Sequence, residues 1–487
     1  MTPTTESAAT AMTWASVQPA LPEMYLTGAI CLLLLVDVFF GDKRRGLTPT
    51  LTLLLLVGGA LITAEYSNVT ERVLLFSESY VADPLAVLLK LIAFAVIAVA
   101  LLYSREYLDR RGMMRGEYYV LSLTALLGVF VLISANSLLT VYIGIELMSL
   151  SLYAMIAFDR DSGIAAESAM KYFLLGAIAS GILLYGMSLI YGLNGTLNLD
   201  VLAEKAMGEP SLGMILGLVF LVVAVAFKFG AVPFHMWVPD VYHGAPTGVT
   251  LFVSTVPKIA SFALAFRLLA HGMGSVGETW QSMLAPLAVL SMAFGNIVAI
   301  AQTNLKRMLA YSAIGNVGFI LLGFVAGSAA GYEAALYYTI AYVLMTLGSF
   351  GVLVLASRAG FEAEDLDQFK GLSKRDPLLA YVMLALMFST AGVPPFIGFW
   401  AKFNILQALW LTDHYWLNII AVTVSVIGAF YYLRIVKLMF FDPPGELPVG
   451  PSAGFPVRAV LALNGLAVFA LGVMPNALIQ LCARVIG

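Results

Sequence analysis

Long apolar stretches with almost no charge recur along nearly the whole chain, and this feature constrains the fold most. A helix needs about 20 mostly apolar residues to cross a bilayer. Of the 487 residues, 61% are hydrophobic and only 11% are charged. Soluble domains carry about 25% charged residues, so too few charges exist here to cover a soluble core of this length. The sequence therefore predicts an integral membrane protein.

The apolar stretches predict an all-α polytopic protein with about fourteen transmembrane helices. These are expected near 22–40, 47–64, 82–103, 117–134, 137–157, 166–192, 212–231, 247–270, 280–300, 305–326, 332–357, 377–410, 415–441 and 457–480. The first 21 residues are polar and carry Glu6 but no basic residue, whereas a cleaved signal peptide begins with a basic region. We expect a short tail outside the membrane before the first helix.

The distribution of Lys and Arg predicts the orientation. With the N-terminus outside, seventeen basic residues fall in the inner loops, and only Arg72, Lys205, Arg267 and Arg484 fall outside. Basic residues are enriched in cytoplasmic loops of membrane proteins. The pattern predicts that both termini lie on the outer side. Lys306 and Arg307 are counted among the loop residues, and His271 is expected to be solvated in an outer loop.

Two apolar stretches are interrupted by proline and glycine. The segments FGAVPFHMW at 229–237 and AGVPPFIGFW at 391–400 resemble each other, and the predicted topology places them in opposite directions. Inverted repeats with broken helices are typical of transporters. Broken helices at membrane depth line a polar cavity or contact other protein segments. The prolines expected to break helices are Pro233, Pro239, Pro257, Pro394 and Pro395.

The repeat divides the chain into four parts. We expect an N-terminal tail with three helices at 1–116, a first five-helix repeat at 117–271, a second at 279–441, and a final helix within 442–487.

The composition excludes several kinds of site. Cys31 and Cys482 lie in apolar stretches at opposite ends, with no spacing typical of a metal site, and two thiols are too few for iron–sulfur ligation. No glycine-rich nucleotide-binding motif is present. Neither a cofactor nor a metal is therefore expected in this chain, and the net charge of -3 does not favour nucleic acid.

One glutamate and the five lysines that are not assigned to loops fall within predicted spans, where a charge costs roughly 2.5–3.5 kcal/mol on insertion scales. They are Glu146, Lys90, Lys171, Lys228, Lys258 and Lys402. Glu146 has no basic residue within one helical turn, so its partner is expected from another helix, with Lys228 and Lys171 as candidates. A lysine loads and releases protons more readily than an arginine. A buried chain of Glu and Lys suits proton transfer.

Each of these residues also has a purely structural interpretation. Glu146 would form a packing ion pair, Lys228 would cap carbonyls at the first break, and Lys258 and Lys402 would have comparable structural roles. Lys171 lies near a helix start and would extend to the surface, and this alternative is favoured for Lys90. His235, between Pro233 and Trp237, suits proton transfer, and an equally good alternative is a structural histidine. The charged run 358–376 is expected to be a solvated connector, or else a docking surface.

The segment 228–265, KFGAVPFHMWVPDVYHGAPTGVTLFVSTVPKIASFAL, resembles the signature of the proton-conducting antiporter-like subunits. These subunits occur in bacterial NADH:quinone oxidoreductase (respiratory complex I) and in multisubunit Na⁺/H⁺ antiporters. The resemblance extends over nearly the whole chain. The long lateral helix of the L-type subunit is missing, and Lys402 stands where the M-type subunit typically has a glutamate.

This resemblance implies roles for the buried residues. Glu146 and Lys228 would form a switching pair, Lys171 and His235 would assist, Lys258 would be the central relay, and Lys402 would serve the outer half-channel.

The resemblance also implies a setting in the bacterial inner membrane. Partners would be M- and L-type subunits, a small K-type subunit, and a peripheral arm that holds FMN and iron–sulfur clusters, with quinone chemistry outside this chain. Two alternatives remain. One is a subunit of a Na⁺/H⁺ antiporter, and the other is a scaffold, which would have no need of buried lysines.

Overall fold

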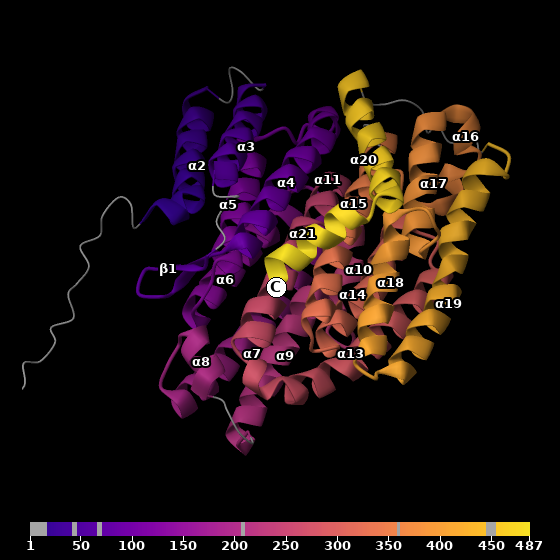
Figure 1. Cartoon of the computed structure of the whole chain (residues 1–487). Coiled ribbons are helices and arrows are strands. Elements are labelled where there is room, and N and C mark those ends of the chain that lie inside the picture. The colour runs from indigo at the N-terminus through magenta and orange to yellow at the C-terminus, as the bar shows by residue number, and fades with distance from the viewer. Residues whose placement is uncertain (1–16, 41–45, 66–70, 206–209, 358–360, 445–453) are drawn as a thin grey trace, which may run out of the picture.

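The computed structural model describes residues 17–40, 46–65, 71–205, 210–357, 361–444 and 454–487. The predicted N-terminal tail therefore lies largely outside the described residues. Within them the chain is almost entirely helical, and the sole sheet is the antiparallel hairpin of β1 (Val73–Leu75) and β2 (Tyr80–Ala82). Figure 1 shows a bundle of roughly aligned helices.

Thirteen helical segments among the described residues are long and apolar enough to cross a membrane. They correspond to α2 (Leu21–Phe40, preceded by η1, Gln18–Ala20), α3 (Leu47–Glu65), α4 (Pro84–Arg110), α5 (Gly116–Ile133), α6 (Leu138–Ile156), α7 (Gly163–Asn194), α9 (Leu212–Phe229), α11 (Thr247–Val253) with α12 (Val256–Ala265) and η2 (Phe266–His271), η3 (Gly274–Val276) with α13 (Gly277–Ala301), α14 (Leu305–Val325), α15 (Ala329–Ala356), α19 (Tyr415–Phe440) and α20 (Phe455–Val473). The polytopic all-α prediction is confirmed.

The remaining predicted span, 377–410, consists of two shorter helices, α17 (Pro377–Ala391) and α18 (Ile397–Leu411). The final predicted span, 457–480, is too long, because α20 ends at Val473 before Pro475. The last helix, α21 (Asn476–Ile486), is separate and amphipathic. Short helices complete the fold, and they are α8 (Leu199–Lys205), α10 (Trp237–Gly244), η4 (Leu366–Phe369) and α16 (Leu372–Arg375).

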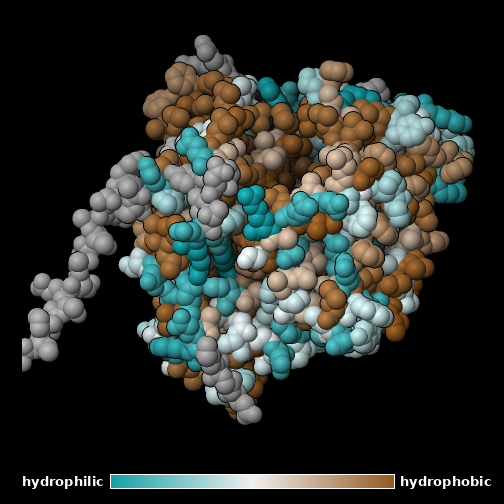
Figure 2. All heavy atoms as spheres, in the orientation of Figure 1, coloured by the Kyte–Doolittle hydropathy of each residue, from teal (hydrophilic) through white to brown (hydrophobic). Residues whose placement is uncertain are grey.

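Helices differ sharply in how much of their surface other helices cover. The segment α11–α12, α14 and α15 are buried on nearly all sides, whereas most residues of α2, α3 and α20 are not buried by other parts of the protein. A helix that is apolar all round belongs in a core or in lipid. Figure 2 shows hydrophobic residues over much of the visible face, with hydrophilic residues gathered at its lower left and upper right edges. This distribution fits a protein embedded in a bilayer.

Both predicted breaks are present and begin in the same way. Helix α9 ends at Phe229 and α17 ends at Ala391, and each is followed by a glycine in the left-handed conformation, Gly230 (φ 77°) and Gly392 (φ 92°). Glycine adopts this conformation without steric cost. A cis X–Pro bond follows in each, at Pro233 and at Pro395.

Backbone contacts support the proposed repeat. Leu138 N donates to Leu197 O at 2.8 Å and Leu199 N to Asn136 O at 3.0 Å. At corresponding positions in the second half, Leu305 N donates to Glu364 O at 2.5 Å and Leu366 N to Thr303 O at 3.0 Å. Each pair clamps the start of one helix, α6 or α14, to a later extended segment. The inverted orientation and the four-part division remain proposals.

Residues expected in outer loops are packed instead. His271 Nε2 contacts Asp200 Oδ1 at 2.7 Å and Arg72 at 3.1 Å, so it is not simply solvated as expected. Arg267 is buried and forms two hydrogen bonds to Asp83, which caps α4. Charged residues at this face therefore join the hairpin to α8 and η2.

Candidate functional site

Lys228 and Glu146 lie on neighbouring helices but are held by different serines. Lys228, in the last turn of α9, is buried, and its Nζ donates to Ser149 Oγ of α6 at 2.8 Å. Ser149 lies about one turn beyond Glu146. The Glu146 carboxylate accepts a hydrogen bond from Ser180 Oγ of α7. Among ion pairs of the described residues, Glu146 forms none with Lys228 or Lys171, so the expected direct pair is absent.

Lys258 is placed against the first break. It is 1% exposed in the first turns of α12, and its Nζ donates to the carbonyl of Phe229, the last residue of α9, at 2.6 Å. Ser261, on the same helix, donates to the carbonyl of Lys228 at 3.1 Å. The carbonyls of a last helical turn lack partners within the helix and favour a nearby cation. The broken end of α9 therefore brings Lys228 and Lys258 together.

Lys402 occupies the corresponding place at the second break. Its Nζ donates to the carbonyl of Ala391, the last residue of α17, at 2.9 Å, and lies 5.4 Å from the Phe319 ring centre. Gly392 gives it room, because a Cβ there would lie 3.0 Å from Lys402 Cδ. Hydrogen bonds among the described residues do not connect Lys402 to Lys258. Helix α15 packs against both α12 and α18.

His235 lies in the irregular segment between α9 and α10. Its ring packs edge-on against Phe294, with centroids 4.8 Å apart. Its Nδ1 is buried without a hydrogen-bond partner among the described residues. The position at the break agrees with the prediction, and no second histidine accompanies it. Among the described residues, no group of three His, Cys, Asp or Glu is placed to hold a metal.

Lys171 lies near the start of α7, apart from the buried lysines. Its side chain is 45% exposed and its Nζ contacts Glu167 at 2.8 Å and Asp240 at 2.9 Å. Asp240 also accepts from Arg307 at 2.9 Å, so it joins α7 to α14. Burial raises the pKa of Asp240, but the hydrogen bonds from Lys171 and Arg307 lower it more, and the pKa lies below its ordinary value.

Lys90 was predicted to extend to the surface, but it is buried. It is 3% exposed on α4, its Nζ lies 2.5 Å from Glu23 Oε1 of α2, and it donates to Tyr80 at 3.0 Å. Glu23 lies far away in the sequence, so no local pattern signalled this pair. Lys306, expected in a loop, is also buried, in the first turn of α14.

Ser149 and Ser180 were missed at the sequence level. Serine is common in membrane helices, where its hydroxyl bonds to its own backbone. Their positions relative to Glu146 become meaningful only once the helices are packed.

Residues 135–428 match a family of transmembrane segments described as NADH:quinone oxidoreductase/Mrp antiporter. The match covers more than half of the chain and contains Glu146, Lys228, Lys258 and Lys402. The chain belongs to this family. Lys90 and Glu23 lie outside the matched region of the NADH:quinone oxidoreductase/Mrp antiporter family.

Curated relatives within the NADH:quinone oxidoreductase/Mrp antiporter family match over nearly their full length. A protein of Thiobacillus denitrificans named NADH-quinone oxidoreductase subunit N is 52% identical, with 96% of this chain and 97% of the relative covered. A protein of the same name from Thioalkalivibrio sulfidiphilus is 51% identical, with 96% and 98% covered.

Two solved structures share the fold of this chain. A chain of respiratory complex I from Thermus thermophilus is 31% identical, with a TM-score of 0.81, and 95% of this chain and 99% of that chain are covered. A chain of the Mrp complex from Dietzia sp. has a TM-score of 0.85 at 21% identity, with 97% of each chain covered. The second likeness shows the fold alone.

Proposed function

We propose that the chain is the N-type antiporter-like subunit in the membrane arm of an NADH:quinone oxidoreductase, where it moves protons coupled to NADH oxidation by quinone. The observation that carries this proposal is the identity of about half, over nearly the full length of both chains, to relatives named as this subunit. The buried lysines at two helix breaks supply groups suited to the task.

In this proposal, protons pass along the buried residues. Glu146 and Lys228 form the switching pair, and Ser149 and Ser180 hold them apart in the state described above. Lys171 and His235 assist, Lys258 is the central relay, and Lys402 serves the second half-channel. Moving one charge against 100 mV requires about 2.3 kcal/mol. Rearrangement of the charges must supply at least this much per proton.

The chain would act as part of a proton-translocating enzyme without a redox centre of its own. FMN, iron–sulfur clusters and quinone would be bound by other subunits. The M- and L-type subunits, a small K-type subunit and the peripheral arm are the proposed partners, and the bacterial inner membrane is the proposed location, with both termini on the outer side.

A Na⁺/H⁺ antiporter subunit is the second candidate. The Mrp chain shares the fold at 21% identity, which is much less than the identity to the NADH-quinone oxidoreductase relatives. The likeness in fold therefore does not favour this alternative.

The proposal is tested with Lys228→Ala in inverted membrane vesicles. NADH oxidation by quinone and proton uptake are followed together, and the amount of assembled complex is measured separately. We expect both activities to fall while the complex remains assembled. If neither changes but sodium-driven proton exchange is lost, the chain serves an antiporter and the redox assignment is wrong.

A further inference from the structure

A cavity of about 160 Å³ lies where the end of α10 meets the start of α14, on the face that carries most of the basic residues. Its lining is rich in ionisable groups. They are Arg111, Asp159, His243, Lys306, Glu362 and Glu364. One of the five helices that contribute to the proposed proton path, α7, also contributes to this wall, next to residues from the end of α10. The cavity is thus a polar recess that reaches into the helical part of the protein.

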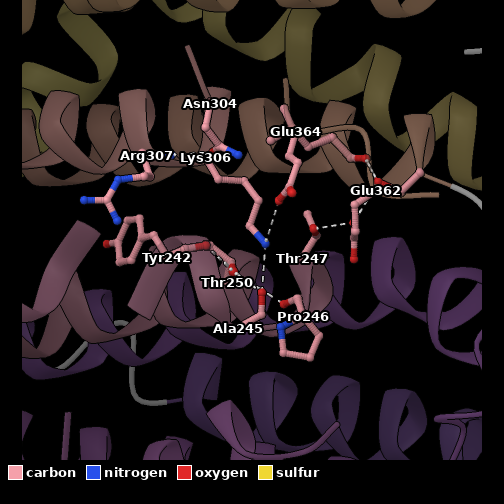
Figure 3. A network of polar contacts seen from close by, with 12 residues as sticks. Tyr242, Ala245, Pro246, Thr247, Thr250, Asn304, Lys306, Arg307, Glu362 and Glu364 are labelled. Atoms are coloured by element: carbon pink, nitrogen blue, oxygen red, sulfur yellow. Dashed lines mark hydrogen bonds and ion pairs between the residues drawn. The ribbon is translucent and has the colours of Figure 1, made fainter. Parts of the chain in front are cut away.

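Lys306 forms the inner wall of the cavity. Only 2% of this residue is exposed, and its Nζ donates to the carbonyl of Ala245 at 2.9 Å. Its ion pair with Glu364 is loose, because the Glu364 Oε2 atom lies 3.8 Å from the Lys306 Nζ atom. Figure 3 shows the amine pointing between the Glu364 carboxylate and the Ala245 carbonyl. A lysine buried this deeply needs a strong partner or a task, and the loose ion pair is a weak partner.

The two glutamates of the cavity differ in how firmly they are held. Glu362 accepts hydrogen bonds from Tyr107 at 2.5 Å and Thr247 at 2.9 Å, and it pairs with Arg111 at 3.0 Å. It therefore fixes the start of α11 against α4. The side chain of Glu364 is 28% exposed and has Lys306 as its ion-pair partner. The Glu362 side chain is almost as exposed, at 24%, but among the described residues Glu364 is the carboxylate that forms an ion pair with the buried lysine.

Buried tyrosines lie on the helices that line the cavity. Tyr242, one turn before Ala245 on α10, is fully buried, and its hydroxyl has no hydrogen-bond partner among the described residues. Tyr172 of α7, the helix that packs against α10, is buried as well. The Tyr172 ring packs against Tyr153 of α6, with centroids 4.9 Å apart. Tyr153 lies one turn beyond Ser149, the residue that holds Lys228.

We propose that this cavity is the aqueous mouth through which protons enter from the basic face, and that Lys306 is the first buried proton-transfer residue, loaded through Glu364. Water in the cavity gives a proton to the Glu364 carboxylate, which passes it to the neutral Lys306 amine. The ammonium then releases it inward, toward the hydroxyls that lead to Lys228. The inference rests on the proposed function and adds a point of proton uptake to it.

A purely structural role for Lys306 predicts a different outcome from the same variants. In that case the lysine only caps the Ala245 carbonyl, and an arginine would cap this carbonyl equally well. Arginine keeps the positive charge and the donors but does not release its proton. The pair Lys306→Met and Lys306→Arg therefore separates capping from proton transfer.

The variants are made in the complete complex and assayed in inverted membrane vesicles for assembly, NADH oxidation and proton uptake. Lys374→Met is the matched control, since Lys374 is an exposed lysine on the same face. We expect Lys306→Met and Lys306→Arg each to lower proton uptake roughly tenfold or more, with the assembled amount unchanged, and Lys374→Met to have no effect.

Full proton uptake in Lys306→Arg would overturn the proposal and leave a capping lysine. If Lys306→Met does not assemble, Glu364→Gln decides, because this partly exposed side chain is not needed for packing. Loss of uptake in Glu364→Gln supports the proposal, and unchanged uptake refutes it. Failure of the proposed function is distinguishable, because Lys228→Ala would then also leave proton uptake unchanged.

Discussion

The buried lysines of the candidate site all donate to neutral oxygens. Lys228 donates to a serine hydroxyl, whereas Lys258 and Lys402 donate to the last carbonyls of broken helices. Lys90, outside the matched family region, lies against a carboxylate instead. A carboxylate holds a charged amine more strongly than a neutral oxygen does. This difference suits the first three lysines to proton exchange and Lys90 to a fixed structural role.

Replacing Ser149 tests whether the hydroxyl positions Lys228. We expect Ser149→Ala to lower proton uptake several-fold, because a hydrogen bond to a charged group contributes about 1.5–3 kcal/mol. Ser151→Ala is the matched control. Ser151 is buried on the same helix, and the hydrogen bond of its hydroxyl within the described part of the chain is to the backbone carbonyl of Leu147. Proton uptake is measured in inverted vesicles, and equal effects of the two variants would show that Ser149 has no special role.

Removing Lys90 tests the structural role of its ion pair. Lys90→Met leaves the Glu23 carboxylate buried without its cation, which costs about 3–5 kcal/mol. We expect a clearly lower melting temperature of the purified complex and partial recovery in the double variant Lys90→Met/Glu23→Gln. Arg72→Met breaks a more exposed pair with Asp200 and should cost less. A double variant no more stable than Lys90→Met would contradict this role.

At the scale of elements, the two breaks place the lysines. Each break combines a helix end, a left-handed glycine and a proline, and each offers carbonyls to a lysine of a following helix. The breaks were predictable, because Pro and Gly interrupt helices through local backbone geometry. The partners of the buried lysines were not predictable. The pairing of Lys90 with Glu23 and the burial of Lys306 depend on how distant helices rotate against one another.

Gly392 allows the geometry of the second break to be tested. Alanine in this left-handed conformation costs about 1–2 kcal/mol, and its Cβ would press on the Lys402 side chain. Gly195 has the same backbone conformation with open space around it. We therefore expect Gly392→Ala to lower proton uptake much more than Gly195→Ala, at similar amounts of assembled complex. Equal losses would mean that backbone strain, and not displacement of Lys402, causes the effect.

At the scale of the whole molecule, the fold class and family were within reach of the sequence, because apolar length and the 228–265 segment are continuous in the chain. The burial of residues in the connector 358–376 was not within reach of the sequence, because it depends on tertiary packing. Residues in 358–376 were expected to be solvated, yet Glu362 contacts α4 and α11 and Glu364 lies beside Lys306. A run of charged residues predicts solvent exposure of its side chains only where no other helix packs against it.

The orientation of the molecule decides on which side the cavity at Lys306 opens. Seventeen basic residues against four predict that the face bearing Lys374 is cytoplasmic and the face bearing Lys205 is not. To test this orientation, Cys31 and Cys482 are replaced with serine, and Lys374→Cys or Lys205→Cys is introduced at an exposed position. A membrane-impermeant maleimide should label Lys205→Cys in spheroplasts and Lys374→Cys only in inverted vesicles, with the cysteine-free chain as control. The reverse pattern would place both termini inside, and the cavity would then release protons outside instead of taking them up from the cytoplasm.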